Sequence, residues 1–137
     1  MPTIWNFTMS LSVKTVNKCR PLNLGNTTYR MNKTLRVLQL GKFYPIMGGV
    51  EKVMYDLMSG LSERGVPCDM LCALSQGSSR TFSINAHSRL IGCRTWMKVA
   101  ATMISPDMIF SLRKRCRDYD IIHVHHPDPM ACLVMFL

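Results

Sequence analysis

The sequence is poor in acidic residues. Its 137 residues include 8 Asp and Glu against 17 Lys and Arg, a formal net charge of +9 at pH 7. Such a basic chain favours anionic partners, namely nucleic acid, a membrane face or a phosphorylated substrate. Because the sequence has no aromatic residues interleaved with basic ones, no RNA-recognition motif and no zinc-finger spacing, we expect no nucleic-acid partner.

Long apolar runs and closely paired cysteines are also missing. No run reaches the roughly 18 apolar residues of a membrane-spanning helix, and the N-terminus lacks the apolar segment of a secretory signal. None of the six cysteines forms a C-x-x-C pair, so we expect free, buried thiols rather than disulfides. These features predict a cytoplasmic protein, with at most a peripheral contact to the inner face of the membrane.

The length suits one domain. Residues 1–30 contain no acid and no hydrophobic period. We expect 1–34 to be a disordered extension, with Met31 as the natural start, and 35–137 to form the domain. The apolar stretch Met130–Leu137 resembles a helix cut in mid-course, so we expect the domain to be truncated.

The clearest pattern runs from Leu35 to Gly65. A short apolar run up to Leu40 predicts a strand buried on both faces, as in a parallel α/β sheet. A loop is expected over Gly41–Gly49, and then a helix that Gly65 ends in a left-handed conformation. Glu51 is assigned to the polar side of this helix. Apolar residues at helical spacing define its predicted buried face, which comprises Val50, Val53, Met54, Leu57, Met58 and Leu61.

The start of this helix is a candidate anion site. A helix N-terminus presents unpaired N–H groups and the positive end of the helix dipole. Gly48 and Gly49 have no Cβ, so a phosphate could approach the backbone closely. The alternative is a plain strand–helix turn with two flexible glycines. The loop matches neither G-x-G-x-x-G nor G-x-x-x-x-G-K-[ST], which excludes a dinucleotide fingerprint and a P-loop.

Strands and helices alternate along the rest of the chain. Ser105-Pro106-Asp107 predicts a helix start with Ser105 as N-cap, and Met130 starts another helix. Trp96–Ser105 is ambiguous. This order predicts a doubly wound, parallel α/β sheet. The further predicted strands are Cys68–Leu74, Thr81–Ile84, Arg89–Thr95 and Asp120–Val124.

The helix after Ser105 carries a basic cluster on its polar side. One interpretation is a solvated face whose charges complement the helix dipole. The other is a contact with an anionic membrane or a lipid-linked acceptor. The cluster consists of Arg113, Lys114, Arg115 and Arg117.

Three histidines mark the end of the last predicted strand. His123 and His125 alternate along it and face one side, whereas His126 faces the other. His123 fits a core role, and His125, at the strand end, is the better candidate for a substrate contact. A metal site formed by His123, His125 and Asp128 is an alternative, but their spacing differs from that of metallo-hydrolases and we expect no metal.

Ligands of such sheets bind beyond the carboxyl ends of the strands. The Gly41–Gly49 and His125–Pro129 loops are therefore expected at one edge. Together, GKFYPIMGGVEKVMYDLMSGLSERG and YDIIHVHHPDPMA resemble the N-terminal domain of GT-B glycosyltransferases of family 4, the retaining nucleotide-sugar enzymes. The resemblance covers Leu35 to Leu137 and points to bacterial mannosyl- and rhamnosyl-type transferases of polysaccharide and lipopolysaccharide synthesis.

The resemblance implies a Rossmann-like, incomplete GT-B N-terminal domain and a specific chemistry. A hexose would pass from a nucleotide-sugar donor to a polysaccharide or lipid-linked acceptor, with no cofactor. Gly48 and Gly49 would approach the donor's diphosphate, and His125 would hydrogen-bond the transferred sugar. The family's second domain carries a spaced pair of glutamates, whereas this chain has only Glu51 and Glu63. We therefore expect an acceptor-side part that is inactive alone.

Two other functions remain open on the residues alone. The first is a metal-dependent hydrolase that uses His123, His125 and Asp128. The second is a non-catalytic module that binds an anionic membrane or a partner through the basic cluster.

Overall fold

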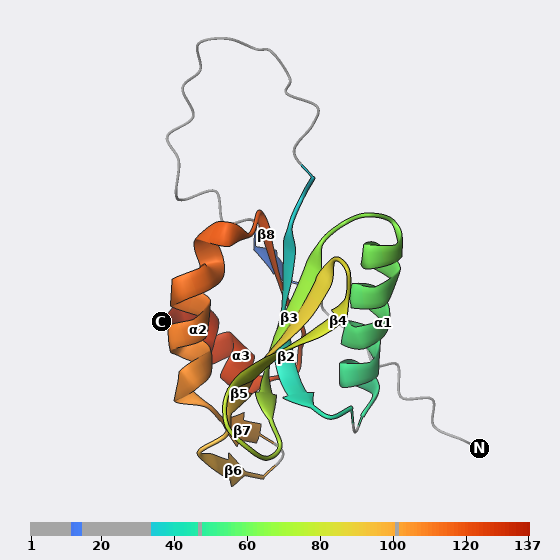
Figure 1. The fold of residues 1–137 in the computed structure, drawn as a ribbon. Coiled ribbons are helices and arrows are strands. Elements are labelled where there is room, and N and C mark those ends of the chain that lie inside the picture. The colour runs from blue at the N-terminus through green and yellow to red at the C-terminus, as the bar shows by residue number, and fades with distance from the viewer. Residues whose placement is uncertain (1–11, 15–33, 47, 101) are drawn as a thin grey trace, which may run out of the picture.

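The computed structural model describes residues 12–14, 34–46, 48–100 and 102–137 (Figure 1). Its strands are β1 (Ser12–Lys14), β2 (Val37–Tyr44), β3 (Cys68–Leu74), β4 (Arg80–Asn85), β5 (Ser88–Arg94), β6 (Met97–Val99), β7 (Thr102–Ile104) and β8 (Ile121–Val124). Its helices are α1 (Gly49–Glu63), α2 (Pro106–Arg115), the short 3₁₀ helix η1 (Cys116–Asp118) and α3 (Pro129–Phe136). The predicted disordered extension over 1–34 lies almost wholly outside the described residues and stays a prediction.

The main sheet is mixed but mostly parallel. Its strand order is β1-β8-β2-β3-β5-β4. The four inner strands, β8, β2, β3 and β5, run parallel to one another, which confirms the predicted parallel α/β sheet. The two edge strands are antiparallel: β1 pairs with β8, and β4 forms a hairpin with β5. The antiparallel edges are the difference from the prediction.

Helices cover both faces of the sheet. α1 lies on one side, and α2 and α3 lie on the other (Figure 1). The core therefore has two parts. The part under α1 is formed by Val37, Met54, Met58, Cys68, Met70, Cys72 and Leu90. The part under α2 and α3 is larger and includes Leu38, Leu40, Leu71, Ile91, Met108, Leu112, Ile122 and Val134.

Strand β2 is longer than predicted and its following loop is shorter. The strand continues through Gly41 to Tyr44, because Phe43 and Tyr44 pair with Ala73 and Leu74 of β3 beyond a register irregularity. The predicted Gly41–Gly49 loop is thereby reduced to residues 45–48. Gly65 follows α1 with φ +76°, which confirms the predicted left-handed residue there.

The buried face of α1 also differs from the prediction. Val53 is 45% exposed, whereas Glu51 is only 2% exposed. The buried positions on α1 are Glu51, Met54, Met58 and Ser62. The hydrophobic pattern did not identify the two ends of this stripe because both are polar. Glu51 lies against Gly48, and Ser62 Oγ donates to Asn85 Oδ1 over 2.8 Å.

Helix α2 begins where predicted, but for a different reason. Ser105 occupies the N-cap position without capping the helix through its side chain. Its hydroxyl donates instead to the Arg94 carbonyl over 2.7 Å, so it ties α2 to the end of β5. The ambiguous segment before it contains the small β6–β7 hairpin. The cysteines of the described segments are free, as predicted.

A buried carboxylate organises the amino edge of the sheet. Asp69, in β3, accepts hydrogen bonds from Tyr119 Oη over 2.6 Å and from Arg89 Nη2 over 2.7 Å. The Arg89 backbone N–H donates to its other oxygen over 2.8 Å. Burial, and then the hydrogen bond to Asp69, raise the pKa of Tyr119. Removing one donor would leave a buried charge less well satisfied.

We predict that Tyr119→Phe lowers the free energy of unfolding by about 2 kcal/mol, the usual scale of a hydrogen bond to a charged group. Urea denaturation measures this change. Tyr55→Phe is the matched control, because the hydroxyl of Tyr55, on α1, makes no hydrogen bond within the described residues. Equal destabilisation by the two substitutions would contradict the role of Asp69.

Candidate functional site

The strand order changes direction at β2, which has β3 on one side and β8 on the other. From β2 the chain passes through α1 to β3 on one side, whereas β8 pairs with β2 on the other. Such a switch point is where open α/β sheets bind ligands, beyond the carboxyl ends of the strands. Residues 45–48 follow β2, and His125–Asp128 follow β8. The structure therefore places the two predicted loops at one edge, where the His125 N–H donates to the Leu40 carbonyl over 2.9 Å.

The two glycines at the start of α1 have different surroundings. Gly48 is the N-cap and Gly49 is the first helical residue. A Cβ on Gly48 would lie 2.7 Å from Glu51 Oε2, whereas a Cβ on Gly49 would meet nothing within 4 Å. A side chain at position 48 would therefore displace the Glu51 carboxylate from this position. Gly49 is the glycine whose backbone remains open to a ligand.

Glu51 is a site residue that the hydrophobic pattern missed. It is the third residue of α1, and its carboxylate lies against Gly48. A negative charge in the first turn of a helix is stabilised by the helix dipole. The spacing of Gly48 and Glu51 is that of a capping box, with glycine in place of Ser or Thr. That spacing was the signal in the sequence.

His125 is buried, with 7% of its surface exposed. Its Nε2 lies 2.7 Å from Gln39 Oε1. Its Cβ approaches β2 at Gly41, where a Cβ added to the glycine would come within 3.2 Å of His125 Cβ and 2.8 Å of Met54 Sδ. Glycine at this point lets the histidine and α1 both pack tightly against the strand.

Gln39 is the second residue that the sequence pattern did not single out. It is fully buried in β2, and its Nε2 donates to the Met54 carbonyl over 3.0 Å and to Cys68 Sγ over 3.3 Å. A polar residue inside the apolar run of a buried strand was the available signal. Gln39 therefore joins β2, α1 and the loop after β8.

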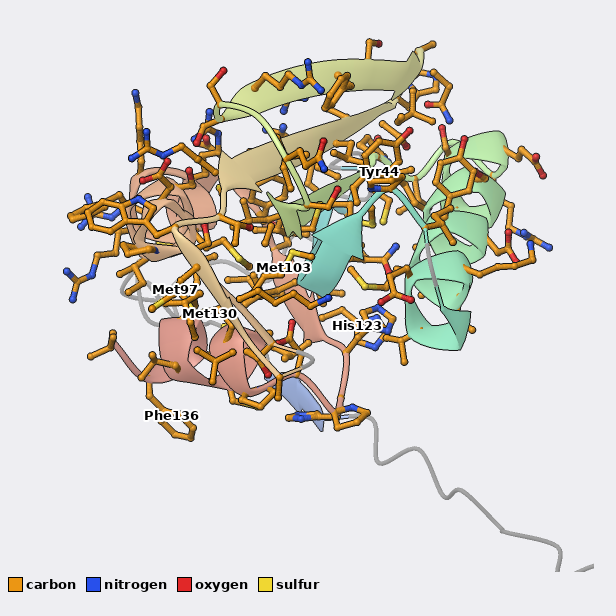
Figure 2. All side chains as sticks on the ribbon, turned by 90° about the horizontal axis from the view of Figure 1, so that it is seen from below. Tyr44, Met97, Met103, His123, Met130 and Phe136 are labelled. Carbon is orange, nitrogen blue, oxygen red and sulfur yellow. The ribbon has the colours of Figure 1, made fainter. Side chains whose placement is uncertain are left out.

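His123 and His125 stack on the α1 side of the sheet, as their alternation predicts. Their ring centroids are 4.3 Å apart with an angle of 32° between the planes. Figure 2 shows His123 between β2 and α1, with Met103 and Met130 beyond β2 on the other side. Within the described residues, no hydrogen-bond partner is found for the buried His123 Nε2.

Burial keeps this pair of imidazoles neutral. It lowers the pKa of His123. It also lowers the pKa of His125 to about 4, and the nearby His123 and His126 contribute to the same shift. A neutral imidazole offers one donor and one acceptor, which suits hydrogen bonding to an uncharged group rather than ion pairing.

Two of the three residues of the alternative metal site make other contacts. Asp128 is the N-cap of α3, where its Oδ1 accepts from the Met130 N–H over 3.0 Å. His125 Nε2 faces Gln39. Across the described part of the chain, no group of three or more His, Cys, Asp or Glu is placed to hold a metal ion. The structure therefore gives no support to the hydrolase hypothesis.

The basic cluster is remote from this edge. α2 starts after β7 at the carboxyl edge and ends, with its cluster, before β8 begins at the amino edge. Arg113, Lys114 and Arg117 are exposed, and basic residues in the last turn complement the helix dipole. In the described segments, no helix is both long and apolar enough to span a membrane.

We predict opposite effects of an added methyl group at the two glycines. Gly48→Ala should lower the free energy of unfolding by about 1 kcal/mol, because the methyl group displaces the Glu51 carboxylate. Gly49→Ala should leave it unchanged or raise it by up to about 1 kcal/mol, because alanine favours helix. Thermal unfolding compares them, and equal losses would contradict the different environments.

Because His125 is neutral in the folded protein, we predict that the free energy of unfolding decreases in acid. Between its ordinary pKa of 6.5 and its folded-state pKa of about 4, the unfolded chain binds a proton that the folded chain excludes. The free energy of unfolding should therefore fall as the pH drops through this window, by about 3 kcal/mol for this group. Urea denaturation at several pH values measures it.

His125→Gln should remove that component of the pH dependence. His87→Gln is the matched control, because His87 is exposed on the β4–β5 turn, and it should retain the wild-type profile. A wild-type profile in His125→Gln would show that His125 is not the group responsible.

Comparison with known proteins identifies the family of this chain. Residues 47–136 match Glycosyltransferase Family 4. The chain is 31% identical over 97 residues to the O-antigen chain mannosyltransferase C of Escherichia coli, an alignment that covers 69% of this chain and 26% of that protein. The chain thus spans about a quarter of the length of this relative. No solved structure gave a significant match. The matched segment includes Gly48, Gly49 and the whole loop after β8, and the chain belongs to Glycosyltransferase Family 4.

Proposed function

We propose that this chain is the N-terminal, acceptor-side part of a retaining glycosyltransferase that transfers a hexose from a nucleotide sugar to a polysaccharide or lipid-linked acceptor. The observation that carries the proposal is the pairing, at one switch point, of an open helix N-terminus with a neutral histidine. Family membership supports the transferase class. The name of the E. coli relative supports mannose as the hexose and O-antigen synthesis as the setting.

Gly49 is proposed to meet the donor's diphosphate. Its surroundings are open, and the first backbone N–H groups of α1 offer hydrogen bonds to phosphate oxygens. Gly48 assists by letting the Glu51 carboxylate pack beside it, which leaves Gly49 to the ligand. No cofactor and no metal ion take part in this proposal.

His125 is proposed to hydrogen-bond the transferred sugar. During transfer with retention, the bond between the anomeric carbon and the phosphate oxygen breaks, and a bond to the acceptor oxygen forms on the same face. The acceptor's hydroxyl proton passes to the departing phosphate oxygen. The protein then contributes orientation and electrostatic stabilisation rather than a nucleophile.

We further propose that the chain binds substrates but does not transfer sugar alone. It has no glutamates other than Glu51 and Glu63, and both belong to α1. The donor half of the reaction therefore depends on groups outside this sequence. The basic cluster at the end of α2 is proposed to contact the anionic inner face of the membrane, on the sheet edge away from the substrates.

The test is substrate binding by the 137-residue chain. Saturation-transfer NMR with GDP-mannose, UDP-glucose and dTDP-rhamnose should reveal binding of at least one nucleotide sugar, and incubation with acceptor lipid should yield no product. Gly49→Asp should weaken the binding about tenfold or more, which corresponds to about 1.4 kcal/mol, because its carboxylate repels the diphosphate.

Gly60→Asp is the matched control. It adds the same charge to α1 farther along the helix, where Gly60 lies near Arg64, and should bind as the wild type does. Absence of binding to any nucleotide sugar would contradict the proposed function. Equal binding by the two variants would contradict only the role of Gly49. Product formation by the chain alone would contradict the proposal that it binds substrates without transferring sugar.

A further inference from the structure

Both polar atoms of the Gln39 amide have hydrogen-bond partners, including a partner for each of its two N–H groups. Its two N–H groups face the Met54 carbonyl at 3.0 Å and Cys68 Sγ at 3.3 Å. Its oxygen faces His125 Nε2 at 2.7 Å. The side chain is fully buried, so each of these contacts replaces water that the group has lost.

The Met54 carbonyl decides which end of the amide faces His125. A carbonyl can only accept, so the NH₂ of Gln39 must be the end that faces it. The Gln39 oxygen is then the end that faces His125, and an amide oxygen can only accept. His125 Nε2 must therefore carry the proton, and His125 Nδ1 is left with a lone pair.

Several contacts keep the ring in this state. Burial keeps His125 neutral at pH 7, the stacked His123 ring covers one face, and the close approach at Gly41 fixes its Cβ. In the described part of the chain, Nδ1 has no hydrogen-bond partner. It is an acceptor with a fixed orientation and no charge.

We propose that Gln39 is a positioning residue that holds His125 as the Nε2–H tautomer, so that Nδ1 accepts a hydrogen bond from a sugar hydroxyl and does not bind phosphate. The inference deepens the proposed function and rests on it for the identity of the ligand. An uncharged acceptor attracts a hydroxyl donor, whereas the oxygens of an ionised phosphate offer only acceptors. His125 would thus hydrogen-bond the sugar, and the N–H groups at the start of α1 would bind the diphosphate.

The tautomer is measured directly by ¹⁵N NMR of the histidine rings in the ligand-free chain. The wild type should show a protonated Nε2 and an unprotonated Nδ1 at His125. Gln39→Met keeps the side-chain volume but removes the acceptor, so the Nδ1–H form should become populated. Gln39→Glu in its protonated, neutral form donates to the Met54 carbonyl and keeps an acceptor oxygen toward His125, so it should retain the Nε2–H form.

Two comparisons separate positioning from a purely structural role. If Gln39 only filled space, Met and Glu would leave the same tautomer. Gln76→Met is the matched control, because Gln76 lies in the exposed β3–β4 loop and should not alter the His125 signals. An Nδ1–H form in the wild type, or an unchanged tautomer in a folded Gln39→Met, would overturn the inference. Should Gln39→Met fail to fold, the wild-type spectrum remains the test, because an Nδ1–H form there would overturn the inference.

The ligand assignment is tested with two probes. Methyl α-D-mannopyranoside should shift the His125 Nδ1 signal, and inorganic phosphate at matched ionic strength should not. A response to phosphate, or to neither probe, would overturn the assignment to a hydroxyl. The tautomer is measured without ligand, so an unexpected tautomer would overturn the role of Gln39 and leave the proposed function standing. Failure of the proposed function would instead appear as a lack of nucleotide-sugar binding.

Discussion

The buried amide of Gln39 is the constraint on which the site depends. It lies in the central strand β2 and is shared between α1, through the Met54 carbonyl, and the loop after β8, through His125. A buried amide that loses a partner pays the full cost of its lost hydration. Neither the helix nor the histidine can shift without that cost. The position of the site histidine is therefore set by the packing of α1 on the sheet.

Three glycines near Gln39 and His125 each have a different structural role. Gly41 lets His125 and Met54 approach the strand from two elements. Gly48 leaves room for the Glu51 carboxylate at the start of α1, and Gly49 leaves the backbone open. The result is a helix N-terminus whose first turn is stabilised by its own carboxylate while one position stays accessible.

The two edges of the sheet have different electrostatic character. At the amino edge, a buried carboxylate is satisfied by an arginine and a tyrosine, and the exposed Arg113 and Lys114 in the last turn of α2 lie beyond it. At the carboxyl edge, burial keeps His123 and His125 uncharged. The groups buried at the two edges therefore differ: a paired carboxylate lies at the amino edge, and two neutral imidazoles lie at the carboxyl edge.

The sequence by itself determined the α/β class, the inner parallel strands, the helices after Gly49, Ser105 and Asp128, and the family, because hydrophobic period and turn residues are local signals. It also indicated that the two loops share an edge, since parallel strands end together. The capping-box spacing of Gly48 and Glu51 is also a local signal, although the hydrophobic period alone missed the burial of Glu51. Only the tertiary structure decided that β2 continues to Tyr44 and that Gln39 bonds His125, because each depends on a partner distant in the chain that no local pattern encodes.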